Sequence, residues 1–173
     1  MVIWLVGLSG SGKTTIGKEI YKLWKPVAPN TVMVDGDDIR KILNRDNEPA
    51  DFTMEGRLKL AKKYGEICLW LDHQDINVIC CTISNFEEVY EFNRKNYSSY
   101  FQVFLDAPIE LLKKRDPKGL YARALAGREK NVVGVDIPFK APTKSDYVLR
   151  MDQQLFSPEV AASDISNKAC NFK

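Results

Sequence analysis

Short apolar runs alternate along the chain with segments in which apolar residues recur every three or four positions. The continuous runs predict buried strands at residues 2–6, 31–34, 76–81, 100–105 and 147–151. The periodic segments predict helices at residues 14–24, 38–44, 54–71, 86–95 and 108–114. Apolar strands that alternate with helices are typical of a parallel sheet with helices on both faces. We therefore expect an α/β fold with three layers (α/β/α) and a five-stranded, mainly parallel sheet.

A segment at about residues 115–142 interrupts this alternation. It is rich in glycine, proline and basic residues and contains one short helical pattern at residues 121–126. Long irregular segments in compact domains are usually functional loops or disordered ones, and open parallel sheets bind ligands beyond the carboxyl ends of their strands. We interpret this segment as a mobile lid over such a site. Ser-Pro-Glu at residues 157–159 predicts the start of a last helix, and the absence of repeats and linkers predicts a single domain over residues 1–173.

Composition and charge narrow the functional classes. The chain is 45% hydrophobic and 28% charged, which is ordinary for a globular protein. Its net charge of +2 is too small to predict a nucleic-acid-binding surface or a polybasic membrane anchor, and no apolar run has the length of a membrane span. The four cysteines form no CxxC pair, which favours free thiols in a reducing cytosol. We expect a cytoplasmic protein that binds neither nucleic acid polymers nor membranes.

A phosphate-binding loop follows the first predicted strand. Residues 7–14, Gly-Leu-Ser-Gly-Ser-Gly-Lys-Thr, match GxxxxGK[ST] at every fixed position, and a helix is predicted directly after them. In this pattern glycines let backbone N–H groups surround the β-phosphate, while Lys13 reaches the β- and γ-phosphates and the Thr14 hydroxyl ligates magnesium. We therefore expect a P-loop NTPase fold, ATP as phosphoryl donor and Mg²⁺ as cofactor. The residues predicted to bind ATP here are Gly7, Ser9, Gly10, Ser11, Gly12, Lys13, Thr14 and Thr15.

Carboxylates at the end of the second predicted strand indicate the acceptor side. Asp35 and Asp37 would lie beside the phosphate loop, where a carboxylate can serve magnesium or accept a proton from an attacking hydroxyl. Arg40, three residues beyond Asp37, can bind an acceptor's phosphate through its fork of N–H groups. We predict that Lys13 is catalytic, and the residues alone leave open which of the two carboxylates serves magnesium or accepts the proton.

Three other functions are weaker hypotheses. Asp-Pro-Lys-Gly at residues 116–119 and Thr-Lys-Ser-Asp at residues 143–146 fit the GTPase patterns DxxG and [NT]KxD, but both patterns are short and the first follows a predicted helix. A nucleotide sensor without activity should lack a catalytic residue, yet Lys13, Thr14 and Asp37 are all present. A kinase for sugars or shikimate-like acids would share the phosphate loop and the lid.

From residue 2 to about residue 152 the chain resembles the adenylylsulfate kinase family. DGDDIR at residues 35–40 is similar to the family's DGDNIR, and RDPKGLY at residues 115–121 is its lid signature without change. This family uses MgATP to phosphorylate the ribose 3′-hydroxyl of adenosine 5′-phosphosulfate. The resemblance implies the same type of reaction, a small nucleotide substrate, and a cytoplasmic homodimer.

The resemblance also implies roles for individual residues. Asp37 would be catalytic, as the base or as the partner of Thr14 in binding magnesium. Arg40 and Arg57 would bind the acceptor's anionic groups, Phe52 would stack on its base, and Arg115 would contact ATP. The remaining residues implied in acceptor binding are Asp35, Leu60, Ile83, Ser84, Lys118, Gly119 and Leu120. Ser84 could also form a phosphoenzyme, but direct transfer needs fewer assumptions.

Three departures from the family pattern lie around the expected base site. Leu60 stands where the family has an asparagine that hydrogen-bonds the adenine edge, Val132 replaces the second stacking aromatic, and Asn85 replaces a proline. A site that loses polar contacts to one substrate changes its specificity. Related proteins of capsule biosynthesis act on cytidine diphosphoramidate, whose base is smaller. We predict this acceptor, with adenosine 5′-phosphosulfate as the alternative.

Overall fold

The computed structural model describes residues 1–173 except 46–47, 85, 152–156 and 173, so Asn85 lies outside the described residues. Its five strands form one sheet in the order β2-β3-β1-β4-β5, and all four strand pairs are parallel. This confirms the predicted α/β fold. The strands are β1 (Val2–Val6), β2 (Thr31–Asp35), β3 (Asn77–Thr82), β4 (Tyr100–Asp106) and β5 (Tyr147–Arg150).

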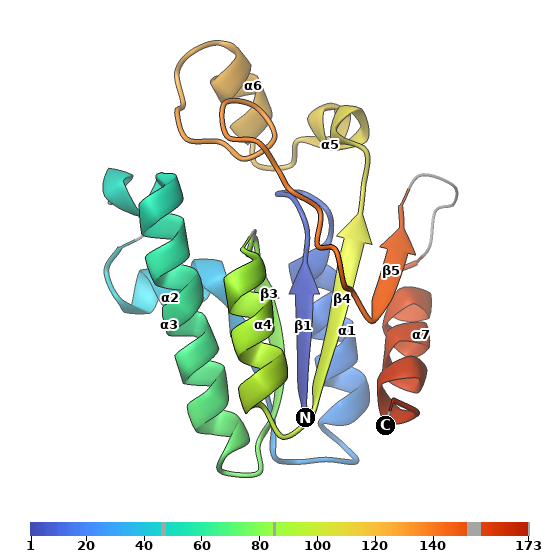
Figure 1. The fold of residues 1–173 in the computed structure, drawn as a ribbon. Helices are drawn as coiled ribbons and strands as arrows, with labels where there is room; N and C mark the ends of the chain where they lie inside the picture. Colours follow the sequence, from blue (N-terminus) through green and yellow to red (C-terminus); the bar gives the residue numbers. More distant parts are fainter. Residues whose placement is uncertain (46–47, 85, 152–156, 173) are drawn as a thin grey trace.

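Helices cover both faces of the sheet (Figure 1), as expected for a three-layer architecture. On one face lie α1 and α7, and on the other lie α3 and α4. The helices are α1 (Lys13–Trp24), α2 (Gly36–Ile42), α3 (Met54–Asp72), α4 (Glu87–Asn96), α5 (Ile109–Arg115), α6 (Leu120–Leu125) and α7 (Pro158–Cys170), with a 3₁₀ turn, η1 (Pro49–Phe52). None of these helices, in the part of the chain that the structure describes, is long and apolar enough to cross a membrane.

The central strand β1 shows why its sequence is apolar throughout. All five of its residues are fully buried, because alternate side chains enter two different hydrophobic clusters. Val2, Trp4 and Val6 pack on the α3 and α4 side, whereas Ile3 and Leu5 pack on the α1 and α7 side. The two clusters fix the register of the sheet and bring the carboxyl ends of its strands to one edge.

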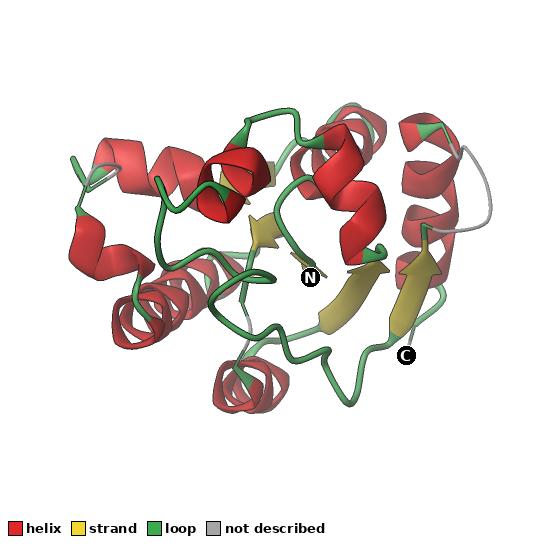
Figure 2. Ribbon diagram, turned by 90° about the horizontal axis from the view of Figure 1, so that it is seen from above, coloured by secondary structure: helices red, strands yellow, loops and turns green. Residues whose placement is uncertain are grey.

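The predicted lid region lies beyond this edge, follows α5 and contains α6 (Figures 1 and 2). Tyr121 and Val132 of the lid region are buried in a small hydrophobic cluster with Leu112 of α5 and Leu8 of the phosphate loop. Tyr121 also donates a hydrogen bond from its hydroxyl to the carbonyl of Ser9, at 2.9 Å. The lid region therefore packs directly on the phosphate loop.

Candidate active site

The phosphate loop has the backbone conformation that its glycines allow. Gly10 and Gly12 have φ angles of 76° and 92°, in the left-handed region that other residues seldom adopt. At Gly7 the limit is space, because a Cβ atom would lie 2.9 Å from the carbonyl oxygen of Leu105. The loop then enters α1, whose N-terminal N–H groups favour an anion.

Lys13 is buried within this loop, and its Nζ donates a hydrogen bond to the carbonyl of Leu8 at 2.7 Å. Burial lowers the pKa of Lys13 to about 8, although the carboxylates of Asp37 and Asp35 oppose this shift. The buried ammonium group is therefore short of compensating negative charge. Phosphate oxygens in the loop would supply that charge.

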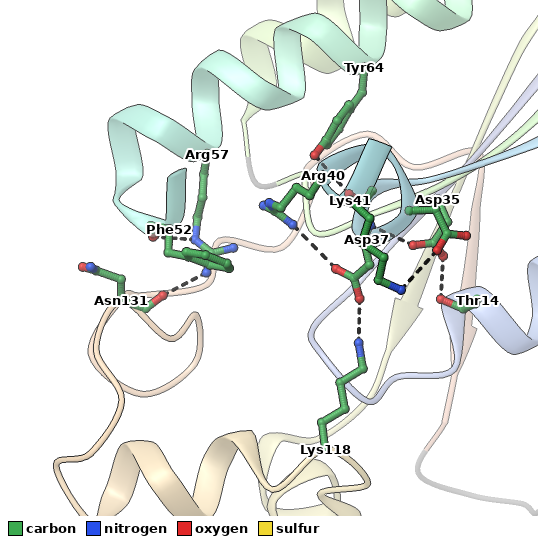
Figure 3. Close-up of polar contacts among 12 residues, drawn as sticks. Thr14, Asp35, Asp37, Arg40, Lys41, Phe52, Arg57, Tyr64, Lys118 and Asn131 are labelled. Carbon is green, nitrogen blue, oxygen red and sulfur yellow. Dashed lines mark hydrogen bonds and ion pairs between the residues drawn. The ribbon is translucent and has the colours of Figure 1, made fainter. Parts of the chain in front are cut away.

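Asp35, and not Asp37, contacts the magnesium-binding hydroxyl expected at Thr14. Thr14 Oγ1 donates to Asp35 Oδ2 at 2.7 Å, while Asp35 Oδ1 accepts from the backbone N–H of Asp37 at 2.9 Å (Figure 3). The second bond caps α2, which is why that helix begins at Gly36, two residues earlier than predicted. The geometry thus adds Asp35 to Thr14 as a candidate metal ligand, while the roles predicted for Asp37 and Asp35 stay predictions.

The donor set of Thr14 and Asp35 fits magnesium. Mg²⁺ prefers oxygen ligands and is usually held by one or two protein groups together with phosphates and water. Among the residues that the structure describes, no cluster of three or more His, Cys, Asp or Glu residues could hold a metal ion alone. A site that the protein and a nucleotide complete together is consistent with both observations.

Asp37 faces two cations (Figure 3). Its Oδ2 accepts a hydrogen bond from Lys118 Nζ at 2.6 Å, and its Oδ1 lies 3.6 Å from Arg40 Nη1. Burial by itself would raise the pKa of Asp37, but the hydrogen bond and charge of Lys118, with help from Arg40, lower it below its usual value. The carboxylate is therefore held ionised, as a proton acceptor must be.

Two guanidinium groups and an aromatic ring form the acceptor side of the site. The guanidinium carbons of Arg40 and Arg57 lie 5.1 and 5.6 Å from the centre of the Phe52 ring. Burial, followed by the charge of Arg40, lowers the pKa of Arg57 to about 10. The Nε of Arg40 is buried without a hydrogen-bond partner among the described residues. Two half-buried cations that contact the same ring favour an anion beside them.

One cavity of about 380 Å³ joins the phosphate loop to these arginines, which is within the range of small-molecule sites. It brings together most of the predicted residues: Ser9, Gly10, Gly12, Lys13, Thr14, Thr15, Asp35, Asp37, Arg40, Phe52, Arg57, Ile83, Ser84, Lys118 and Leu120. Predicted residues outside its lining are Gly7, Ser11, Leu60, Arg115 and Gly119. Leu60 lies on the face of α3 that packs into the core, Arg115 is exposed, and Gly119 caps α6.

Sequence reasoning missed part of this lining. Ala61 and Tyr64, on the same helix as Arg57, line the cavity and were not among the predicted site residues. The lid adds Arg123 and residues 129–132. Asn131 acts through its backbone, since its carbonyl accepts a hydrogen bond from Arg57 Nη2 at 2.9 Å (Figure 3). A backbone acceptor leaves no signal in the residue type.

Known proteins resemble the chain over most of its length. The family model Adenylylsulphate kinase matches residues 1–150. A cytidine diphosphoramidate kinase from Campylobacter jejuni is 40% identical over 148 residues, covering 86% of this chain and 84% of the relative. An adenylyl-sulfate kinase from Halothermothrix orenii is 33% identical over 154 residues, covering 89% of this chain and 82% of the relative.

The structural comparison agrees with these matches. The APS kinase of Mycobacterium tuberculosis, solved in complex with AMPPNP and APS, superposes with a TM-score of 0.86 at 29% identity, covering 96% of this chain and 95% of the other. The sequence expectation of an adenylylsulfate-kinase-like enzyme is thereby confirmed. A complete phosphate loop, a carboxylate beside it and a match over residues 1–150 lead to one conclusion: the chain belongs to the adenylylsulphate kinase family.

Proposed function

We propose that the protein transfers the γ-phosphoryl group of ATP to the ribose 3′-hydroxyl of cytidine diphosphoramidate. The observation that carries the proposal is the position of Asp37, which lines the same cavity as Lys13 of the phosphate loop and Arg57 of the acceptor side. A hydroxyl bound against Asp37 would face a phosphate bound against Lys13. The 40% identity to a cytidine diphosphoramidate kinase supports this acceptor.

The site residues have separate roles in an in-line transfer. Lys13 and the backbone N–H groups of the loop bind the β- and γ-phosphates. Asp37 orients the acceptor hydroxyl and takes its proton as the new bond between oxygen and phosphorus forms and the bond to the ADP oxygen breaks. Lys118, 2.6 Å from Asp37, is close enough to balance charge on the transferred group. Thr14 and Asp35 would hold Mg²⁺, which when bound neutralises phosphate charge.

Direct transfer is supported over a phosphoenzyme at Ser84. The Ser84 side chain is only 1% exposed, and its buried hydroxyl has no hydrogen-bond partner among the described residues that could activate it. A nucleophilic serine requires an adjacent base. Asp37, in contrast, is a carboxylate in a position to receive a proton.

The two candidate acceptors differ in their nucleobase, which is cytosine in one and adenine in the other. Phe52 offers an aromatic face, whereas Val132 on the lid side is aliphatic and 3% exposed, within the lid cluster. A single aromatic face suits a pyrimidine better than a purine that is stacked on both sides. The alternative acceptor, adenosine 5′-phosphosulfate, is supported by the Halothermothrix orenii relative and by the APS-bound Mycobacterium tuberculosis structure.

A coupled ADP-release assay with MgATP tests the proposal when both acceptors are compared at equal concentrations. We expect kcat/KM to be at least about tenfold higher for cytidine diphosphoramidate, the discrimination that one lost stacking or hydrogen-bond contact supports. A preference for adenosine 5′-phosphosulfate would make the protein an adenylylsulfate kinase. Omission of Mg²⁺ should abolish turnover with either acceptor.

We also propose a cytoplasmic homodimer with one domain per chain and a mobile lid. The family resemblance supports these assignments. Light scattering of the purified protein measures the mass of the assembly, and a mass of a single 19.7 kDa chain would exclude the dimer.

A further inference from the structure

Asp136 lies outside the cavity lining, yet its carboxylate organises the loop that contacts Arg57. Asp136 Oδ2 accepts from the backbone N–H of Asn131 and Oδ1 accepts from that of Val132, both at 2.6 Å. The turn is closed by a hydrogen bond from Gly134 N to the carbonyl of Ile137, at 2.7 Å. Burial would raise the pKa of Asp136, but these backbone donors and the Arg57 charge lower it. The carboxylate therefore stays ionised while it holds the turn.

The two contacts of Asp136 fix a strained part of the backbone. Asn131 has a φ angle of 62°, in the left-handed region, which residues with a side chain seldom adopt, asparagine more often than most. Asn131 is therefore held in this conformation by its surroundings. Its own N–H and the next N–H along the chain both point to one carboxylate.

The peptide unit between Asn131 and Val132 links Asp136 to Arg57. It is rigid and planar, with the N–H of Val132 and the carbonyl of Asn131 pointing in opposite directions. Asp136 holds the N–H end at 2.6 Å, and Arg57 Nη2 contacts the carbonyl end at 2.9 Å. A rotation of this peptide that broke the first contact would also break the second.

Arg57 is oriented by backbone carbonyls on two sides. In addition to the bond with Asn131, its Nε donates to the carbonyl of Phe52 at 2.8 Å (Figure 3). A guanidinium group has five N–H donors, so three remain for a ligand after these two bonds. With one carbonyl lost, the fork of Arg57 could rotate and would bind an oxyanion less well.

We propose that Asp136 is a positioning residue. Its carboxylate holds the 131–132 peptide so that Arg57 presents its free N–H groups to the acceptor's anionic group. This inference rests on the proposed function, because it requires that Arg57 binds the acceptor. It predicts an effect on the Michaelis constant of the acceptor alone, since Asp136 contacts neither the phosphate loop nor Asp37 in the described contacts.

The test is a double-mutant cycle of Asp136→Asn and Arg57→Lys, measured by ADP release with whichever nucleotide acceptor the wild type uses. In the amide, one of the two accepting oxygens is replaced by an NH2 group, which is itself a donor and cannot accept a backbone N–H. We expect Asp136→Asn to raise the acceptor KM about tenfold, with kcat and the KM for ATP changed less than about twofold. In the Arg57→Lys background the same substitution should change the acceptor KM less than about twofold, because lysine has one nitrogen in place of the Nε and Nη2 that reach the two carbonyls.

Asp116→Asn is the matched control. Asp116 also accepts two backbone N–H groups in the lid region, from Tyr121 at 3.2 Å and Ala122 at 2.9 Å, without a described contact to Arg57 or Asn131. Any effect of Asp116→Asn should be the same with Arg57 and in the Arg57→Lys background. A role of Asp136 in lid stability alone would make the two aspartate variants behave alike.

The possible failures can be told apart. If Asp136→Asn raises the acceptor KM equally in both Arg57 backgrounds, or leaves it unchanged, the inference is wrong while the proposed function stands. If the wild type uses neither acceptor, the proposed function fails first. Should Asp136→Asn fold poorly, Asp136→Ser, which keeps one oxygen acceptor, enters the same cycle, with the KM for ATP as the check on folding.

Discussion

At the scale of single residues, the active-site carboxylate Asp37 depends on a cation from a distant part of the chain. Lys118 bonds to it across 81 positions of sequence, at 2.6 Å, although both side chains are more than half exposed. An exposed ion pair contributes little to stability. Its effect on the protonation of Asp37 is of greater functional interest, because the Lys118 contact lowers a pKa that burial would raise.

Removal of this cation should change the pH dependence of the reaction. Asp37 accepts a proton only when ionised, so activity is lost as the pH falls through its pKa. Lys118→Ala removes the interaction that lowers this pKa, and we expect the acidic limb of the kcat/KM profile to move to higher pH. Profiles of wild type, Lys118→Ala and the charge-conserving control Lys118→Arg measure the shift. Acidic limbs that coincide in all three proteins would show that Lys118 does not control Asp37.

Individual site residues were predictable to different degrees. The phosphate loop and Asp37 could be found because their chemistry requires particular residue types at fixed spacing. The contact of Asp35 with Thr14 could not, since two carboxylates two residues apart have the same signature until the helix cap is known. Leu60 was placed by its position in a family pattern, whereas its side chain packs in the core.

At the scale of elements, the turn η1 lies tightly against the first turn of α3 and carries Phe52 to the acceptor side. A Cβ atom on Gly56 would lie 2.0 Å from the carbonyl oxygen of Ala50 and 2.7 Å from the Cα of Asp51. Thr53 caps α3 by accepting from the N–H of Gly56 at 3.1 Å. The position of Phe52 therefore depends on the absence of a side chain at Gly56 in α3.

Gly56→Ala should displace η1. The added methyl group meets backbone atoms that cannot rotate away, so we expect a loss of about 1–3 kcal/mol in the free energy of unfolding. The acceptor KM should rise more than the KM for ATP, because Phe52 moves while the phosphate loop stays. Gly65→Ala in the same helix is the control, since its Cβ would meet a side-chain atom, Asn93 Oδ1, at 3.2 Å. Urea unfolding and initial-rate kinetics measure both effects, and an unchanged ratio of the two KM values would contradict the prediction.

Most elements were predicted close to their observed limits, because long apolar runs and strong helical periodicity determine them. The turn η1 was missed, since four residues carry no periodic signal and the turn is held by its packing on α3. Helix α2 begins two residues before its predicted start, because the Asp35 side chain accepts a hydrogen bond from the backbone N–H of Asp37 and so caps the first turn. Short elements and element ends depend on such local contacts more than on hydrophobic pattern.

At the scale of the whole molecule, the lid region is joined to the sheet body near the active site. Its contacts include Lys118 with Asp37, Tyr121 with the carbonyl of Ser9, and the carbonyl of Asn131 with Arg57. Each of these contacts involves a group of the phosphate loop or of the acceptor side. Ligands that bind these groups should therefore change the exposure of the lid.

Limited trypsin digestion tests this coupling. Arg123, Arg128 and Lys130 are exposed in the lid region and provide cleavage sites. We expect AMPPNP with Mg²⁺ and an acceptor together to slow cleavage at these positions about tenfold, because ligands that bind the closed form reduce opening. Cleavage in α7, at Lys168, is the internal control. Equal rates at the lid with and without ligands would exclude a lid that closes on its substrates.

The two backbone carbonyls that hold Arg57 have a consequence for how such enzymes diverge. Every residue has a carbonyl, so positions 52 and 131 can change their side chains without loss of the groups that orient this arginine. Anion recognition can thus be kept while base recognition changes. A lineage can exchange the residues around the nucleobase, test a new nucleotide and keep the charged half of its substrate site throughout.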